Sequence, residues 1–392
     1  MAVPLKELSK LVENFRDFKS FRNISLKNES DIEKIPITTR EDLAKLTLND
    51  CPEIPVVVGA TSGSTGKNLY VFFSRKAHEM KEKRVKQIME INKIKKDNII
   101  LNLMAYGMQL SGNVVECSFI RSNNTIVPLG GSDDIERLMM LSHILDKIKP
   151  NIVFSTMSIA SHLIDKSIYN GSCIKKCFVA GEVLLPEFRR LIENRGIQVY
   201  NLYGLCEAGG VAVQENPKDE FMRILDGVYI EILNNNGKIS ETGRGEILIT
   251  DLFNFSSPII RYRVGDEIEI KEKNDKKYMR IFGRRDNFTN INESVIPNNL
   301  LIGKIMEILG NNKFFIKITK NYKTYKDFVV IYLQEKDMKL IREVKTALRG
   351  MGINCDIIFR KTDKGAQKTI TGKSKHIIDA RKLKLDDKKL NW

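Results

Sequence analysis

The stretch Gly59-Ala-Thr-Ser-Gly-Ser-Thr-Gly-Lys-Asn68 decides how the rest of the chain is interpreted. Apolar runs at 54–58 and 69–73 flank it, so we expect two strands joined by this loop. Three glycines and four hydroxyl residues can place N–H and O–H groups around phosphate oxygens, and Lys67 adds a cation. It is not a P-loop, because a threonine replaces the first glycine of that motif and an asparagine its last hydroxyl. Ordinary surface loops share this composition, so the following segments must decide.

The composition is that of a soluble globular protein of two or three domains. The chain has 392 residues, of which 42% are hydrophobic and 29% charged. No apolar run approaches the roughly 20 residues that span a bilayer, and the first twenty residues lack a signal-peptide core. Six scattered cysteines favour reduced thiols. We therefore expect a cytoplasmic location and no membrane partner.

The net charge of +15 is concentrated at the C-terminal end. Residues 284–392 carry 24 Lys and Arg against 12 Asp and Glu, whereas residues 1–283 carry 40 against 37. A basic module can bind nucleic acid, a membrane surface or a polyphosphate. A general bias toward lysine along the chain explains part of the surplus.

The pattern of apolar segments predicts an α/β fold. Short apolar strands and amphipathic helices alternate from 99 to 202, which is typical of βα units around a mostly parallel sheet. Residues 1–50 are expected to be mainly helical, with an apolar stripe of Leu5, Leu8, Leu11, Phe15 and Phe18, and 75–94 is expected to be a long charged helix. From 227 the segments become shorter and more β-like, and beyond 286 the chain restarts as a small α+β module. The order expected in that module is a helix near 300–309, strands near 314–318 and 327–333, a helix near 338–349, a strand near 356–359 and a polar loop over 361–375. We expect a large N-terminal domain with mixed and parallel sheets flanked by helices (1–283), followed by a small basic C-terminal domain (284–392).

Polar residues follow two of the expected strands, where open α/β sheets bind their ligands. Gly181 and Glu182 follow one strand, and Glu207 ends the stretch Tyr203-Gly-Leu-Cys-Glu after another. A carboxylate beside a phosphate loop can hold Mg²⁺. Glu207 could equally be an acid at a helix N-terminus. Asp266, placed after a glycine at the end of a strand, suits either ribose hydroxyls or a turn.

Taken in order, these segments resemble the adenylate-forming superfamily, and within it the phenylacetate–CoA ligase-like branch. The resemblance covers almost the whole chain. Its motifs are Thr61-Ser-Gly-Ser-Thr-Gly-Lys67, Ala180-Gly-Glu182, Tyr203-Gly-Leu-Cys-Glu207, Ile260-Arg-Tyr-Arg-Val-Gly-Asp266, Gly283-Arg-Arg-Asp-Asn287 and Thr371-Gly-Lys373. Each motif alone is modest, whereas six in the right order and spacing are a strong signal.

The resemblance implies an ATP and Mg²⁺ site in the large domain. The residues it assigns to the nucleotide are Ser62, Gly63, Ser64, Thr65, Gly66, Lys67, Gly181, Glu182, Tyr203, Gly204, Asp266 and Arg284. In the family pattern the loop binds the β/γ-phosphates, Tyr203 stacks near the adenine and Glu207 binds Mg²⁺. Asp266 holds the ribose hydroxyls with the assistance of Arg284.

The resemblance also implies that the C-terminal domain is a mobile lid. Asp286 is the hinge about which the lid turns, and Lys373 bridges the carboxylate and the α-phosphate during the first half-reaction. Both Glu207 and Lys373 are therefore expected to be catalytic. A carboxylate is a weak nucleophile facing an anionic triphosphate, so cations must neutralise the repulsion.

The acid pocket is expected between two segments of the large domain. Its residues are Tyr106, Gly107, Met108, Ala208, Gly209 and Gly210. The aromatic, thioether and small side chains favour a flat or elongated apolar acid, aryl or acyl. The same residues could equally belong to the core.

The expected activity is activation of a small carboxylic acid to an acyl-adenylate, followed by transfer to a thiol, with CoA as the first choice. Cys206 replaces the hydroxyl that usually precedes the Mg²⁺ acid, and 290–294 lacks the glycine usual after the hinge. The altered segment after the hinge and the short N-terminus favour an alternative, in which the acceptor is an amine or a carrier-protein thiol. A nucleic-acid-binding protein using 284–392 is a remote alternative that leaves the other motifs unexplained. The oligomeric state stays open, with a homodimer as one option.

Overall fold

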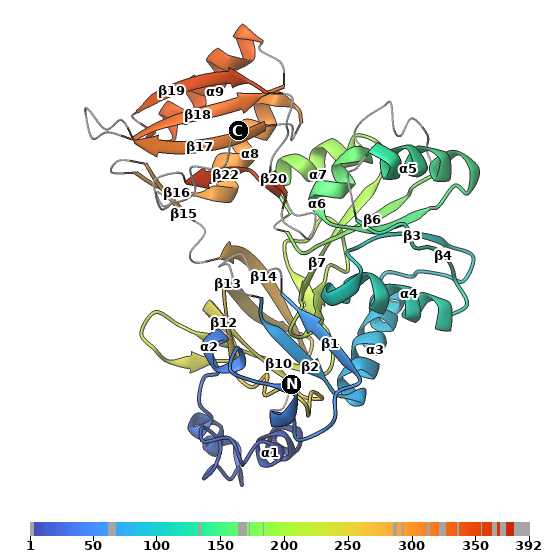
Figure 1. Ribbon diagram of the computed structural model, residues 1–392, viewed down its shortest axis with the longest axis vertical. Coiled ribbons are helices and arrows are strands. Elements are labelled where there is room, and N and C mark those ends of the chain that lie inside the picture. Colours follow the sequence, from blue (N-terminus) through green and yellow to red (C-terminus); the bar gives the residue numbers. More distant parts are fainter. Residues whose placement is uncertain are drawn as a thin grey trace.

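The computed structural model shows a large domain built on a twelve-stranded sheet and a smaller C-terminal domain built on a four-stranded sheet (Figure 1). This arrangement confirms the predicted α/β class with a small α+β domain after it. The boundary near 283–287 stays a prediction. The structure describes residues 4–61, 68–131, 135–163, 171, 173–182, 184–284, 288–291, 294–311, 314–320, 327–334, 337–353, 355–362, 367–368 and 374–379.

Five parallel strands form one end of the large sheet and confirm the predicted βα region. Strands buried on both faces need apolar side chains at every position, which is why these segments are continuous apolar runs. In spatial order the strands are β4 (Thr125–Val127), β3 (Ile99–Leu103), β5 (Ile152–Ser155), β6 (Lys176–Ala180) and β7 (Gln198–Leu205). The helices of this region are α3 (Arg75–Ile91), α4 (Ser111–Arg121), α5 (Ile135–Lys147), α6 (Met157–Ala160), η4 (Ser161–Leu163) and α7 (Pro186–Glu193).

Helices cover both faces of the parallel strands (Figure 1). On one face Ile100 of β3 packs with residues of α3 and α4, among them Phe119. On the other face the next residue, Leu101, packs with residues of α5 and α7, among them Phe188. Side chains of a strand alternate between the two faces, so neighbouring residues enter different cores.

The other end of the large sheet is antiparallel and carries the β-rich segment predicted after residue 227. Its strands, in spatial order from β7, are β8 (Gly209–Val213), β9 (Met222–Ile224), β14 (Lys276–Arg284), β13 (Tyr262–Lys273), β12 (Gly243–Asp251), β10 (Val228–Leu233) and β11 (Ile239–Ser240). A separate hairpin of β1 (Val57–Ala60) and β2 (Tyr70–Phe73) packs into one hydrophobic cluster with these antiparallel strands. The hairpin confirms the two strands predicted around the glycine-rich loop.

The N-terminal fifty residues are less helical than predicted. They contain α1 (Leu5–Asn14), the short helices η1 (Glu29–Lys34), α2 (Arg40–Leu43) and η2 (Leu48–Asp50), and turns between them. Leu8, Leu11 and Phe15 of the predicted apolar stripe are buried, and they pack in one cluster with Ile260, which lies just before β13. The apolar spacing was therefore correct for α1 but did not continue as one long helical region.

The C-terminal domain has the order of elements predicted from the sequence. The β15–β16 hairpin (Phe288–Ile291 and Ser294–Pro297) precedes α8 (Asn298–Leu309). The sheet has the order β19-β18-β17-β22, with strands β17 (Phe314–Lys320), β18 (Asp327–Leu333), β19 (Asp356–Lys361) and β22 (Ile377–Asp379), and α9 is Met338–Gly350. In the predicted polar loop 361–375, β20 (Gln367–Lys368) pairs with β21 (Ser374–Lys375). Among the described residues, no helix has the length and apolarity needed to cross a membrane.

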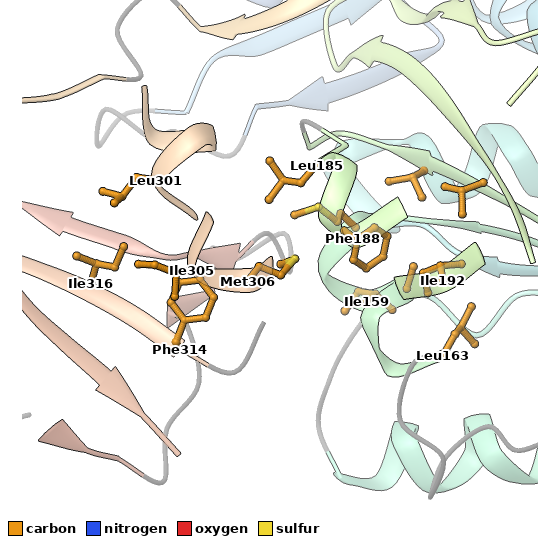
Figure 2. Packing of buried hydrophobic residues seen from close by; sticks show 14 of the residues in the cluster. Ile159, Leu163, Leu185, Phe188, Ile192, Leu301, Ile305, Met306, Phe314 and Ile316 are labelled. Atoms are coloured by element: carbon orange, nitrogen blue, oxygen red, sulfur yellow. The ribbon is translucent and has the colours of Figure 1, made fainter. Parts of the chain in front are cut away.

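One hydrophobic cluster joins the two domains across α7 and α8. Leu185 and Phe188 from the α7 side and Leu301, Ile305 and Met306 from α8 are all buried in it. Figure 2 shows Met306 on the side of α8 that faces Phe188. At the rim of this contact Arg190 of α7 forms an ion pair of 3.5 Å with Glu307 of α8. The small domain is thus held beside α7 mainly by apolar packing.

Candidate active site

The predicted phosphate loop starts at a well-defined hairpin. Ala60 pairs with Tyr70, and the Thr61 N–H donates to the Leu69 carbonyl at 2.9 Å. The Thr61 hydroxyl oxygen accepts hydrogen bonds from the Leu69 N–H (3.3 Å) and from the Arg40 guanidinium (3.0 Å). Ser62, Gly63, Ser64, Thr65, Gly66 and Lys67 lie outside the described residues.

The stretch that ends at Glu207 connects two antiparallel strands rather than a strand and a helix. It runs through the end of β7 and a turn into β8. The alternative in which Glu207 caps a helix is therefore wrong. The Cys206 thiol donates to the Ala60 carbonyl at 3.3 Å, so this turn lies directly beside the start of the predicted phosphate loop.

Two buried carboxylates each accept a hydrogen bond from a tyrosine of a neighbouring segment. The Tyr203 hydroxyl donates to Asp266 Oδ2 at 2.6 Å, and the Tyr262 hydroxyl donates to Glu207 Oε1 at 3.1 Å. Each carboxylate residue is only 7% exposed. Both bonds run between β13 and the β7–β8 strand pair. The structure thus brings together three predicted site residues and adds Tyr262.

The two tyrosines stay protonated at neutral pH and can act only as donors to the carboxylates. Burial is the main cause that raises the pKa of Tyr203 well above 10, and the Asp266 carboxylate adds to it. The pKa of Tyr262 is also raised, by burial first and by the Glu207 carboxylate second. Arg40, which bonds Thr61, opposes the rise for Tyr262.

Asp266 lies inside a strand, not at the end of one as predicted from the sequence. It pairs with Arg284 between β13 and β14, next to an irregularity of the ladder. Arg284 is exposed, and its guanidinium donates to the Val264 carbonyl at 3.4 Å. A Cβ atom at Gly265, where φ is +91°, would lie 3.0 Å from the Arg284 Nη2 atom. Glycine at this position therefore permits both the positive φ and the close approach of the Arg284 guanidinium.

Glu182 is held by a neighbouring short helix. Its carboxylate accepts hydrogen bonds from the Ser158 N–H (2.7 Å) and the Ser158 hydroxyl (2.6 Å) at the start of α6. The bond joins the end of β6 to the segment that follows β5. Gly181 lies beside it, at the carboxyl edge of the parallel strands where a ligand is expected.

The three residues predicted from η3 (Gly107–Gln109) and its N-terminal neighbour have different surroundings. Tyr106 is half-buried, accepts a hydrogen bond from the Asn102 amide (2.8 Å) and lies against Gly112. Burial, followed by Glu116, raises its pKa. Nothing lies within 4 Å of a Cβ atom built on Gly107, and Met108 is exposed. Met108 and the open space beside Gly107 therefore lie at the protein surface, where a ligand can contact them.

The small residues Ala208, Gly209 and Gly210 are the surface on which α3 packs. The guanidinium of Arg84 donates to the Ala208 carbonyl at 2.5 Å. A Cβ atom at Gly209, where φ is +77°, would lie 2.9 Å from Lys81 Cγ. The sequence offered no clue to Arg84 or Lys81, because in a helix rich in charged residues both look like solvated side chains.

The remaining predicted residues are not placed. Lys373, the predicted catalytic lysine, and Asp286, the predicted hinge, lie outside the described residues. Their nearest described neighbours are Ser374 of β21 and Arg284 of β14.

The residues present fit a single Mg²⁺ ion that is shared with a polyphosphate. Among the described residues, no group of three or more acidic, histidine or cysteine side chains could hold a metal by itself. Mg²⁺ in nucleotide sites usually takes one or two carboxylates and completes its octahedron with phosphate oxygens and waters. Glu207, beside the start of the loop and oriented by Tyr262, can supply that carboxylate.

Comparisons with known proteins agree with this geometry. Residues 8–256 match the family described as AMP-binding enzyme. The chain is 25% identical over 296 residues to the phenylacetate-coenzyme A ligase of Escherichia coli (strain K12), covering 69% of this chain and 66% of that protein. It is 25% identical over 288 residues to the ligase of the same name from Aromatoleum evansii, with 69% and 64% covered. The match thus spans just under two thirds of these relatives.

The fold is also that of a solved CoA ligase. The crystal structure of 2-hydroxyisobutyryl-CoA ligase in the postadenylation state, in complex with 2-HIB-AMP, superposes with a TM-score of 0.77 and 18% identity. The superposition covers 97% of this chain and 91% of that one. The predicted resemblance to the phenylacetate–CoA ligase-like branch of the adenylate-forming enzymes is thereby confirmed, and the chain belongs to the AMP-binding enzyme family.

Proposed function

We propose that the protein uses ATP to activate a small aryl or acyl carboxylic acid and then transfers the acyl group to the thiol of CoA. In the first step a carboxylate oxygen attacks the α-phosphorus of ATP, the bond to pyrophosphate breaks, and an acyl-adenylate forms. In the second step the CoA thiolate attacks the acyl carbonyl and AMP leaves. Positioning and charge neutralisation are sufficient for both steps, and no protein nucleophile is needed.

The observation that carries this proposal is the pair of tyrosine–carboxylate contacts beside the predicted phosphate loop. Tyr203 orients Asp266, which is the residue proposed to hold the ribose hydroxyls, with Arg284 next to it. Tyr262 orients Glu207, which is the residue proposed to hold Mg²⁺. When bound, Mg²⁺ would supply positive charge to the phosphate oxygens. Fixing both acids before ATP arrives reduces the reorganisation that binding requires.

The remaining proposed roles come from the sequence motifs. The loop 62–67 binds the β/γ-phosphates, Gly181, Glu182 and Gly204 line the nucleotide site, and Lys373 bridges the carboxylate and the α-phosphate. Asp286 is the hinge of a small domain that moves between the two half-reactions. Such a movement must break the apolar packing between α7 and α8.

A pyrophosphate exchange assay tests the proposed function. Labelled pyrophosphate should enter ATP when Mg²⁺ and a suitable carboxylic acid are both present, because the adenylation step is reversible. A panel of aryl and acyl acids should give exchange with at least one of them. No exchange with any acid, in protein that binds ATP by calorimetry, would contradict the proposal.

A second assay identifies the acceptor. With the best acid, CoA should yield a thioester, whereas amines and carrier-protein thiols should leave the acyl-adenylate unused. The Lys373→Ala variant should lose exchange and keep transfer from a supplied acyl-adenylate. Transfer to an amine but not to CoA would support the alternative acceptor that the altered segment 290–294 favours.

A further inference from the structure

Lys81 is a buried cation beside the predicted acid pocket. It lies on α3 and is only 2% exposed, whereas Lys83 and Lys86 of the same helix are exposed. Its methylene groups pass over Gly209, where a Cβ atom would lie 2.9 Å from Cγ and 3.2 Å from Cδ. Any larger residue at 209 would force the lysine chain to move. The glycine thus lets Lys81 reach past β8 toward the interior of the domain.

The ammonium group ends over a buried aromatic ring of the hydrophobic core. Lys81 Nζ lies 3.0 Å from the centroid of the Phe73 ring, and Phe73 is fully buried in β2. The ring of Phe73 also packs beside β1, because a Cβ atom built on Gly59 of that strand would lie 3.0 Å from Phe73 Cε2. The same Cβ atom would lie 3.3 Å from the Met108 carbonyl. Lys81 therefore ends on a ring that packs beside Gly59 of β1, and Gly59 in turn lies next to the η3 segment to which the acid pocket is assigned.

The charges around Lys81 do not include a direct acceptor. Among the described residues, no oxygen forms a hydrogen bond or an ion pair with its ammonium group; the Asp251 carboxylate lies 3.4 Å from Arg84 instead. Burial lowers the pKa of Lys81 from 10.5 to about 7. Asp251, Cys206 and Glu207 oppose that change, and Arg84 adds to it.

A buried ammonium without an acceptor is costly, and an apolar side chain of the same length would fill the space at lower cost. The ring of Phe73 compensates for only part of the lost hydration. Lys81 has no acceptor among the described residues and lies against Gly209 of the predicted acid pocket, so its charge is matched to a group that the ligand brings.

We propose that the Lys81 ammonium binds a second anionic group of the acid substrate, in addition to the carboxylate that is activated. This inference rests on the proposed function and names its substrate class, a diacid, where the sequence favoured a purely apolar acid. Lys81 is then a specificity-determining residue. A neutral acid of the same length would leave the buried ammonium unpaired, and that is how a polar site rejects an apolar analogue.

The test compares matched acids in the pyrophosphate exchange assay. The pairs are phenylacetate with 4-carboxyphenylacetate and hexanoate with adipate, so that each diacid has a counterpart without the second charge. The wild-type protein should use the diacid of at least one pair roughly 10- to 100-fold better in kcat/KM, the range expected for a charge-assisted hydrogen bond. Lys81→Met should remove this preference by lowering the diacid value, while the value for the neutral acid stays the same or rises because no ammonium is left unpaired.

Two further variants control the interpretation. Lys83→Met removes an exposed lysine from the same helix and should leave both values unchanged. Lys81→Gln keeps a donor of similar length without the charge, and it replaces Lys81→Met if that variant does not fold. Thermal unfolding and ATP binding establish that each variant is intact.

The outcomes separate this inference from the proposed function. Exchange by the wild-type protein with neutral acids only, or an equal loss for both acids of a pair in the Lys81 variants, would overturn the role of Lys81 and leave adenylation standing. Absence of exchange with every acid would contradict the proposed function itself. A preference for diacids that disappears in the Lys81 variants alone would support the inference.

Discussion

The nucleotide side and the acid side of the candidate site treat buried charge differently. On the nucleotide side, Glu207 and Asp266 are each 7% exposed, and each accepts a hydrogen bond from a tyrosine. On the acid side, Lys81 is 2% exposed, and among the described residues it contacts an aromatic ring rather than an acceptor. The first region is arranged before its ligand binds, whereas the second is left for the ligand to complete.

A second buried cation on the same helix makes the contrast sharper. Arg84 is one turn from Lys81 and donates to the carbonyl groups of Ala208, Asp226 and Gly227 and to the Asp251 carboxylate. Arg84 therefore ties α3 to three segments of the large sheet. The comparison teaches that burial alone does not define the role of a charge; its partners within the protein do.

The largest expected effect is on stability, in Arg84→Met. Removing Arg84 takes away the cation that pairs with the buried Asp251 carboxylate and a donor to three carbonyl groups, and we expect the free energy of unfolding to fall by about 3–5 kcal/mol. Lys81→Met should not lower it and should raise it by about 1 kcal/mol or more, because an apolar side chain replaces a buried ammonium that has no acceptor among the described residues. Urea unfolding followed by circular dichroism measures both. Equal destabilisation by the two variants would break the comparison and make Lys81 a structural residue.

The next effect is on catalysis, in Glu207→Gln. The amide keeps the size of the side chain but removes the charge proposed to bind Mg²⁺. We expect kcat/KM for ATP in the exchange assay to fall by roughly 10²-fold, with a higher Mg²⁺ concentration needed for half-maximal rate. Glu215→Gln, in an ion pair with Arg223 outside the site, is the matched control and should behave as wild type. An unchanged Mg²⁺ dependence in Glu207→Gln would remove Glu207 from the metal site.

A smaller effect is expected when only the orienting hydroxyls are removed. Tyr203→Phe and Tyr262→Phe each delete one hydrogen bond to a buried carboxylate, which we expect to cost about 10-fold in kcat/KM. Tyr203→Phe should raise the KM for ATP through Asp266, and Tyr262→Phe should raise the Mg²⁺ requirement through Glu207. Steady-state kinetics at varied ATP and varied Mg²⁺ distinguish the two. The same kinetic change in both variants would show that the two carboxylates do not have separate roles.

The smallest expected effect is on the pH dependence of stability, and it concerns Asp31, a carboxylate outside the candidate site. Asp31 caps η1, and its hydrogen bond with Lys34, together with the N–H groups of Lys27 and Asn28, lowers its pKa from 3.8 to about 2. A lowered pKa in the folded state means that the stabilisation is complete above about pH 4 and is lost as the pH falls through about 2.

The Asp31→Asn variant should therefore melt slightly below wild type at pH 6, and the difference should shrink toward pH 2. Thermal unfolding at several pH values measures this difference. A difference independent of pH would mean that the shape of the cap, and not its charge, provides the stabilisation.

Much of the fold could be predicted because it rests on local patterns. The apolar segments between 99 and 202 became the parallel strands and their helices, and the small C-terminal domain has the predicted order of elements. The long helix predicted over 75–94 is α3, which ends at Ile91. The prediction failed where local pattern and tertiary packing differ: Asp266 lies within a strand and Glu207 in a turn between strands.

The nucleotide residues could be predicted because each belongs to a motif with a fixed spacing. Tyr262 was part of such a motif, but only the structure shows that its hydroxyl bonds Glu207. Arg40, Lys81 and Arg84 belong to no motif, and their types are among the commonest in exposed helices. The burial of Lys81 and Arg84 and the contact of Arg40 with Thr61 depend on which segment packs against them, and spacing along the chain does not contain that information.

By itself, the sequence determined the fold class, the order of the elements and the motifs that predict a nucleotide site, because apolar periodicity and glycine placement act over short stretches of chain. The tertiary structure alone decided which charges are partnered. It placed Tyr203 and Tyr262 on two acids, Arg84 on carbonyl groups and Lys81 over Phe73. The physical reason is that the cost of a buried charge is set by the acceptors and donors that long-range packing brings to it.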